Sequence, residues 1–162
     1  TAMNKFYSFL KGKDLRIVDE IARDFFNKEL KAHINMATAS TLEDHRKLGR
    51  RILIASNAPE FIVRYVAEFL RAHNYLATKF EISNGVYTGR VTGDLMYNIN
   101  KSKAVSNFIA TQRLNHRALW VYTDHISDLP LLEIAKNKIV VNPDRKLAKL
   151  ANKLKWKTIY TS

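Results

Sequence analysis

Hydrophobic and polar positions follow two different periods along this 162-residue chain. Residues 3–34 carry apolar side chains at the three- and four-residue spacing of an amphipathic helix, with Asp14 as a candidate cap. From residue 51 onward, short continuous apolar runs alternate with further helical patterns. Continuous runs are typical of strands that are buried on both faces, as in parallel sheets. The pattern therefore predicts an α/β fold with a parallel sheet.

The predicted elements after residue 34 alternate in type. A polar break at 35–40 precedes a helix over 41–48, which ends at Gly49. Asn84-Gly85, between two runs of alternating residues, predicts a two-residue hairpin turn. The other elements are strands over 51–56, 76–82, 118–124, 138–143 and 156–160, and helices over 60–73, 101–113, 131–135 and 145–157.

Polar side chains collect where these strands end. Ser56 and Asn57 follow the first core strand, Asp124 and Asp128 follow the next one, and Asn142 ends a third. Ligands of parallel α/β sheets bind beyond the carboxyl ends of the strands. Any one of these residues is also what a helix cap requires. Ser56 and the aspartate pair, taken together, favour a functional site at this edge of the sheet over a set of helix caps.

The residue types at this edge predict phosphate and metal chemistry. Two carboxylates four residues apart on a strand-to-helix turn can converge on one point, and Mg²⁺ prefers such oxygen ligands. Ser56, predicted at the start of a helix, and the N–H of Asn57 can bind a phosphate oxygen. Lys101 heads another helix, where its charge opposes the helix dipole unless an anion is bound nearby. We expect Lys101 in a surface cleft, and the simpler alternative is a plain surface lysine.

Composition narrows the class of protein. The formal net charge of +12 predicts attraction to polyanions. The basic residues are spread along the chain, and the densest run, 145–157, places Leu147, Leu150 and Leu154 at helical spacing. This spacing favours an amphipathic helix with a solvated basic face over a nucleic-acid surface.

The remaining features concern compartment and assembly. The chain has no cysteine, so it has neither a disulfide framework nor a thiolate metal site. No apolar run approaches the roughly 20 residues that span a bilayer, and no signal pattern opens the chain. These features fit a cytoplasmic protein with no membrane partner. A homodimer is compatible with the sequence.

Three segments in this order resemble the haloacid dehalogenase superfamily, specifically its phosphoserine-phosphatase-like branch. They are "LIASNAPEF", "NGVYTGRVTGD…NKSKAVSNF" and "VYTDHISDLPLLEIAKNKIVVNPDRKLAKLANKLKW". The resemblance covers residues 10–159. It implies a Rossmann-like parallel sheet with helices on both faces, plus part of a small helical cap. Residues 1–45 would be the remainder of the cap, and residues 46–162 would be the core domain.

The resemblance also implies roles for the candidate residues. Ser56 matches the second motif, which holds the transferring phosphoryl group, with Asn57 beside it. Lys101 matches the lysine of the third motif, which balances the charges of the phosphate and the nucleophile. Asp124 and Asp128 match the fourth motif and would hold Mg²⁺. His125 departs from the small residue usual after this aspartate, and either lies on the surface or faces the metal.

The largest departure concerns the first motif, Asp-x-Asp, whose first aspartate is the nucleophile. Among the eight aspartates of the chain, no two are separated by a single residue. We therefore expect the chain to be inactive by itself. One hypothesis is a phosphatase that forms an aspartyl-phosphate on small phosphorylated substrates, with its nucleophile segment missing from this sequence.

Other hypotheses remain open. A non-catalytic module that binds a phosphorylated ligand or a partner is one, and a nucleic-acid-binding domain is the least favoured. Two glycines usual after the second-motif serine are replaced here by Asn57-Ala58-Pro59, which weakens phosphoserine as the substrate. The missing strand would lie between the strands over 51–56 and 118–124. We therefore expect the 162 residues to be unstable without an upstream segment of roughly 60–80 residues, estimated from the usual size of domains, or another chain that fills the gap.

Overall fold

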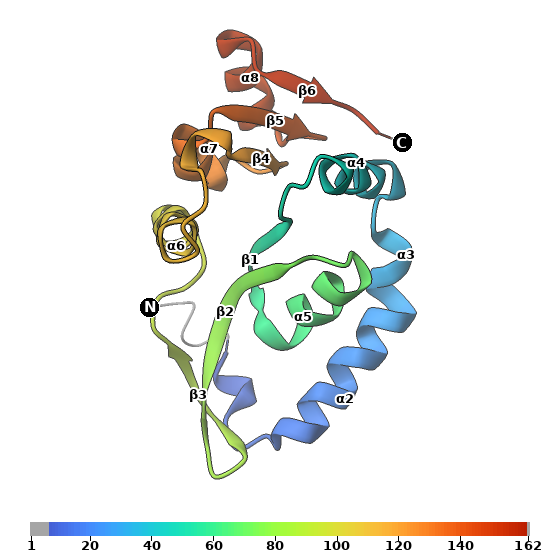
Figure 1. Cartoon of the computed structure of the whole chain (residues 1–162). Helices are drawn as coiled ribbons and strands as arrows, with labels where there is room; N and C mark the ends of the chain where they lie inside the picture. The colour runs from blue at the N-terminus through green and yellow to red at the C-terminus, as the bar shows by residue number, and fades with distance from the viewer. Residues whose placement is uncertain (1–6, 162) are drawn as a thin grey trace. The chain divides into compact units, whose positions relative to one another are not determined.

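The computed structural model describes residues 7–161. It divides the chain into two compact units, Thr1–Met96 and Tyr97–Ser162, whose elements are labelled in Figure 1. Each unit is built on its own three-stranded sheet, with the strand orders β1-β2-β3 and β4-β5-β6. The α/β class predicted from the sequence is confirmed. The boundary predicted between residues 45 and 46 stays a prediction.

The first unit opens with helices. A 3₁₀ turn, η1 (Ser8–Leu10), precedes a continuous run of α2 (Leu15–Phe25), the π-helical η2 (Phe26–Leu30) and α3 (Lys31–His33). The predicted cap is confirmed, because Asp14 Oδ1 accepts the N–H of Arg16 at 2.7 Å. The predicted polar break at 35–40 is wrong, since α4 (Met36–Lys47) already begins there. Asn35 caps this helix by accepting the N–H of Thr38 at 2.8 Å, which outweighs the weak apolar pattern.

The sheet of the first unit is mixed. Strand β1 (Leu53–Pro59) leads into α5 (Glu60–Phe69) and then β2 (Asn74–Ser83), which is parallel to β1. β3 (Val86–Thr92) returns antiparallel to β2. Asn84 and Gly85, between β2 and β3, have φ angles of 50° and 78°. The predicted hairpin is confirmed, because a turn of this kind needs positive φ at both central residues.

β1 is less buried than its sequence predicts. Burial on both faces was expected, yet every residue of β1 is only half-buried except Asn57, which is exposed. Within the described part of the chain, β1 pairs with β2 alone, so its other edge has no partner strand. A continuous apolar run indicates that a strand is suited to burial on both faces, but the elements that bury it must come from other parts of the protein.

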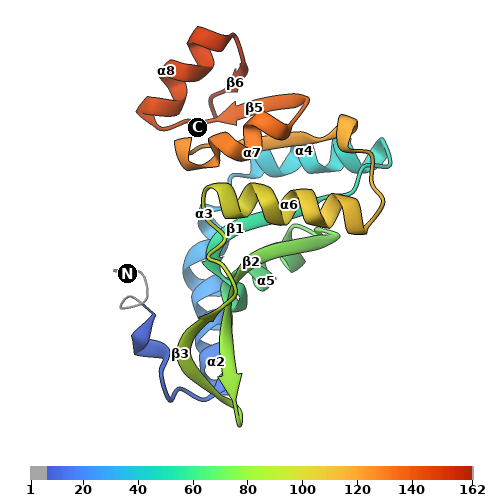
Figure 2. The same ribbon diagram turned by 90° about the vertical axis from the view of Figure 1, so that its left-hand side faces the viewer.

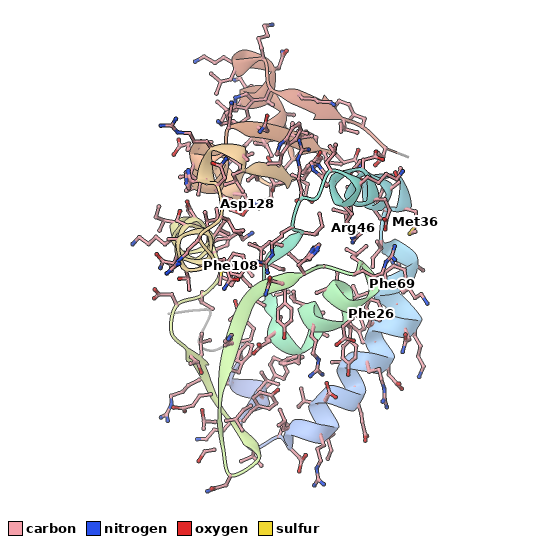
Figure 3. All side chains as sticks on the ribbon, viewed as in Figure 1. Phe26, Met36, Arg46, Phe69, Phe108 and Asp128 are labelled. Atoms are coloured by element: carbon pink, nitrogen blue, oxygen red, sulfur yellow. The ribbon has the colours of Figure 1, made fainter. Side chains whose placement is uncertain are left out.

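α2 covers α5 with only part of its apolar surface. Phe26, which continues α2, meets Phe69 edge to face at a centroid distance of 5.8 Å (Figure 3). Val18 and Ala22 on the same face are buried. Ile21 and Phe25 lie on the adjacent stripe, and 63% and 45% of their surfaces are exposed. Half of the apolar stripe of this helix therefore has no cover in the described structure.

The second unit is a parallel α/β layer. Its elements are α6 (Ile99–Thr111), η3 (His116–Ala118), β4 (Trp120–Thr123), η4 (Ile126–Asp128), α7 (Leu129–Ile134), β5 (Asn137–Val141), α8 (Arg145–Leu154) and β6 (Lys157–Ile159). All pairings are parallel. Figure 2 shows α7 and α8 beside the strands β5 and β6 of this sheet. Leu132, Val140, Leu147 and Ala151 are fully buried and form its core.

No helix in the described residues combines the length and the apolar character needed to cross a membrane.

Candidate functional site

Three polar side chains form a buried group in the second unit. Lys101, in the first turn of α6, places Nζ 2.6 Å from Oδ1 of Asp128. Thr123, the last residue of β4, donates its hydroxyl to the other oxygen of Asp128 at 2.7 Å. Each of the three residues is less than a tenth exposed, and Figure 3 labels Asp128 at the start of α7. The structure therefore brings together two of the predicted residues and adds Thr123.

The burial of Lys101 corrects one expectation. Lys101 was expected in a surface cleft, but only 7% of it is exposed. Ser102, the next residue, donates its hydroxyl to the backbone carbonyl of Pro130 at 3.0 Å and so connects α6 to α7. A buried ammonium group requires a counter-charge, which Asp128 supplies. Because Lys101 has three N–H donors, it can also donate to an anion that reaches the group.

Asp124 differs from Asp128 in its surroundings. It follows β4 directly and is exposed. Its carboxylate has no hydrogen bond or ion pair within the described residues, whereas its backbone carbonyl accepts the N–H of Asp144 at 2.7 Å. The part of the sequence that the structure covers holds no cluster of three or more His, Asp or Glu side chains that could bind a metal ion. The turn between β4 and α7 thus carries two carboxylates in different surroundings, the exposed Asp124 and the buried Asp128.

His125 lies on the surface, one of the two positions open from the sequence. Its side chain is 57% exposed. Its Nδ1 accepts the N–H of Ser127 at 3.1 Å and lies 2.8 Å from the hydroxyl of that residue. Because Nδ1 accepts, this tautomer carries its proton on Nε2, which lies 3.8 Å from Oδ2 of Asp144. The ring caps the short turn η4.

Asp144 connects two elements of the second unit. Its Oδ1 caps α8 by accepting the N–H groups of Lys146 and Leu147 at 2.8 and 2.9 Å. Its Oδ2 accepts the N–H of Ile126 at 2.6 Å. Burial alone would raise the pKa of this carboxyl, but these hydrogen bonds from Leu147, Ile126 and Lys146 lower it below the usual value. Sequence analysis did not single out Asp144 as a site residue, although an aspartate before a helix signals a cap.

Asn142, expected at the same edge of the sheet, has a structural role. Its side chain accepts the N–H of Thr161 at 2.9 Å and donates to the hydroxyl of that residue at 2.9 Å. These contacts hold the end of the chain against β5.

Ser56 and Asn57 lie in the first unit. The prediction that Ser56 begins a helix is wrong, because β1 continues through an irregular segment to Pro59, and α5 starts only at Glu60. The Ser56 hydroxyl instead accepts the N–H of Ala58 at 3.2 Å. The backbone carbonyl of Asn57 accepts the hydroxyl of Thr78, a fully buried residue of β2, at 2.9 Å. The irregular end of β1 is thus held by β2, and the side chain of Asn57 is exposed.

Comparison with protein families gives one clear match. The sequence model of the haloacid dehalogenase-like hydrolases matches residues 1–133. Phosphoserine phosphatase SerB1 of Mycobacterium tuberculosis is 23% identical over 152 residues, which are 94% of this chain and 49% of that protein. A histidinol-phosphatase of Neisseria meningitidis is 28% identical over 141 residues, which are 85% of this chain and 64% of that protein. The chain spans about half the length of the first curated relatives it matches.

Solved structures share the fold. A protein of unknown function from Bordetella pertussis matches 96% of this chain and 71% of its own, with a TM-score of 0.89 and 21% identity. A substrate-bound phosphoserine phosphatase matches 97% of this chain and 70% of its own, with a TM-score of 0.69 and 16% identity. At these identities the likeness shows a common fold.

Proposed function

The chain belongs to the haloacid dehalogenase-like hydrolases, and from this membership we propose that it is part of a Mg²⁺-dependent phosphatase of small phosphomonoesters. The observation that carries the proposal is the buried pair of Lys101 and Asp128, joined at 2.6 Å. A buried ion pair adds little net stability, because the desolvation of both charges offsets their attraction. A functional use explains its presence better. The relatives named as phosphoserine phosphatase and histidinol-phosphatase support substrates of this class.

Each candidate residue has a role in this proposal. Lys101 neutralises charge on the phosphate, and Ser56 and Asn57 donate hydrogen bonds to the phosphoryl oxygens. Asp124 and Asp128 hold Mg²⁺. The donor set fits this ion, because Mg²⁺ accepts one or two carboxylates with water and phosphate oxygens as further ligands, and the exposed Asp124 carboxylate has no partner among the described side chains. When bound, Mg²⁺ neutralises developing charge and orients the phosphoryl group.

The nucleophile comes from outside the present sequence. An aspartate carboxylate attacks phosphorus, the ester P–O bond breaks, and the leaving alkoxide oxygen takes the proton of a second, protonated aspartic acid to become the alcohol. Water then hydrolyses the aspartyl-phosphate and releases inorganic phosphate. No Asp-x-Asp pair occurs in the 162 residues, so both aspartates lie in another segment. Among the described residues, β1 and β4 are each an edge strand of their own sheet, which supports a further strand that carries this segment.

A helical cap accounts for the uncovered face of α2. We place residues 1–45 in the cap and residues 46–162 in the core domain. Ile21 and Phe25 expose a stripe beside the buried Val18 and Ala22. Further cap helices outside this sequence would cover that stripe. The absence of cysteine favours a cytoplasmic location, and a homodimer is compatible with these features.

Turnover by the full-length protein tests the function. An aryl phosphate and a panel of phosphorylated metabolites are incubated with Mg²⁺, with EDTA, and with Mg²⁺ restored after EDTA. We expect hydrolysis that EDTA abolishes and Mg²⁺ restores. Equal hydrolysis in all three conditions, or none in any, contradicts the proposal.

A non-catalytic binding module is the second candidate, favoured by the absence of Asp-x-Asp from the sequence. It shares the phosphate-binding residues but forms no covalent intermediate. Full-length protein that binds inorganic phosphate, loses this binding in a Lys101→Met variant, and hydrolyses no substrate of the panel would establish this candidate.

A further inference from the structure

Asp144 makes hydrogen bonds to the backbone of two separate elements of the second unit. Oδ1 accepts from the first turn of α8, and Oδ2 accepts the N–H of Ile126 in η4 at 2.6 Å. The backbone N–H of Asp144 also donates to the carbonyl of Asp124 at 2.7 Å. The segment Asp124–Asp128 is therefore hydrogen-bonded at two points to Asp144, the residue that caps α8.

Capping alone does not explain this arrangement. A capping side chain needs one acceptor oxygen for the free N–H groups of the first turn, as Asp14 shows at α2 with its Oδ1 on Arg16. Asp144 uses its second oxygen on Ile126, which is 18 residues earlier in the sequence. A neutral serine at this position could cap α8 but could not reach η4.

The hydrogen bonds from Asp144 act at the exposed end of the Asp124–Asp128 segment, where His125 N–H also donates to the hydroxyl of Thr123 at 3.3 Å. Asp128 is buried and held by Lys101 and Thr123. Asp124 is exposed, and no other described residue forms a hydrogen bond or ion pair with its carboxylate. Its direction therefore depends on the backbone between residues 124 and 126. α8 is a firm base for this support, because Leu147 and Ala151 are fully buried.

We propose that Asp144 is a positioning residue, which fixes the backbone of the Asp124–Asp128 segment so that Asp124 is held in the orientation that binds Mg²⁺. This inference rests on the proposed function. Groups behind the ligands of a metal commonly control affinity by about 10–100-fold. We expect Asp144→Ser to raise the Mg²⁺ dissociation constant by roughly 10-fold or more.

The variants separate positioning from capping. Asp144→Ser retains a helix cap and the backbone bond to Asp124, but removes the bond to Ile126. Asp144→Asn keeps the size of the side chain, but one of its two oxygens becomes an amide that cannot accept. Asp14→Ser makes the same substitution at the cap of α2 and is the matched control.

Two readouts on the full-length protein decide the matter. Amide hydrogen exchange at Ile126 and Leu147 reports the two sides of the Asp144 contact. Calorimetry with Mg²⁺ alone reports the affinity without turnover. We expect faster exchange at Ile126 with little change at Leu147, together with weaker Mg²⁺ binding, in Asp144→Ser but not in Asp14→Ser.

Several outcomes would overturn the inference. Unchanged exchange at Ile126 shows that Asp144 does not hold η4. Faster exchange with unchanged Mg²⁺ affinity shows that the contact has no effect on the metal, and absence of Mg²⁺ binding by the unaltered protein removes the metal altogether. A protein that binds Mg²⁺ but hydrolyses no phosphomonoester refutes the proposed function alone, since exchange and calorimetry still test Asp144.

Discussion

Removing the charge of Lys101 is the perturbation whose effect the structure defines best. In Lys101→Met the side chain keeps its approximate length and apolar stem but loses the ammonium group. Asp128 then remains in a site where 12% of its side chain is exposed, with Thr123 as its remaining hydrogen-bond partner among the described side chains. The variant thus leaves a buried carboxylate without its counter-charge.

The expected loss of stability follows from two opposing contributions, the attraction between the two charges and the cost of removing them from water. At the observed separation of 2.6 Å, the attraction is about 6 kcal/mol if the effective dielectric constant is about 20. Desolvation of both ions offsets much of it, so the pair as a whole contributes little. Removal of one partner is different, because the other charge stays buried, and typically costs about 3–5 kcal/mol. Lys101→Met should therefore lower the free energy of unfolding by that amount.

A double-mutant cycle measures this effect. Urea unfolding is followed for the unaltered protein, Lys101→Met, Asp128→Asn and the double variant. Because the amide introduced by Asp128→Asn could still accept from Thr123, the double variant should lose only about 1–2 kcal/mol, as expected for a changed hydrogen bond. The two single substitutions should each cost more than the double substitution. Lys103→Met, at an exposed position of the same helix, should leave stability within about 0.5 kcal/mol. Additive effects of the two single substitutions would refute the argument that the charges depend on each other.

Three further predictions concern other parts of the protein. Ile21→Ser should lower the free energy of unfolding of the full-length protein by about 2 kcal/mol if further helices cover this residue. In the 162-residue chain, the same substitution should cost far less than Ala22→Ser, because Ala22 is buried. Equal costs of Ile21→Ser in the two proteins would contradict the proposed cap. Burial lowers the pKa of His45, so the folded protein favours the neutral ring. The stability associated with the neutral ring is fully present above the ordinary pKa of about 6.5 and is lost as the pH falls below it. Urea unfolding should accordingly show less stability at about pH 5.5 than at about pH 7.5, and His45→Gln should reduce that slope; an unchanged slope would exclude His45 as its source. Asp124→Asn should weaken Mg²⁺ binding, measured by calorimetry, at least about 10-fold, because a charge beside a divalent ion contributes several kcal/mol where water is partly excluded. The control variant Glu133→Gln, at an exposed position of α7, should leave Mg²⁺ binding unchanged.

The parts of the fold that depend on local chemistry could be predicted from the sequence. The hairpin at Asn84-Gly85 was predictable because few residue pairs tolerate two positive φ angles. The cap at Asp14 and the amphipathic helix α8 were predictable for similarly local reasons. The start of α4 was missed, although Asn35 carried a capping signal, because the mostly small residues at 37–41 gave no helical period of large apolar side chains to accompany the cap.

The parts that depend on distant residues could not be predicted. The burial of Lys101 is set by Asp128, 27 residues later, and no local pattern records that contact. The second oxygen of Asp144 serves Ile126 on another element, so its sequence context shows only the cap. β1 has the apolar composition of a covered strand, but its burial depends on partners that its own sequence does not contain.

The measurement that tests the central claim most directly is the location of the phosphoryl group during turnover. The full-length protein is mixed with a phosphomonoester and Mg²⁺, quenched rapidly in acid, digested, and analysed by mass spectrometry. The account predicts one phosphoryl group on an aspartate outside the 162 residues, absent when EDTA replaces Mg²⁺. A phosphoryl group on a residue within the 162, or hydrolysis with no phosphorylated aspartate, would contradict it.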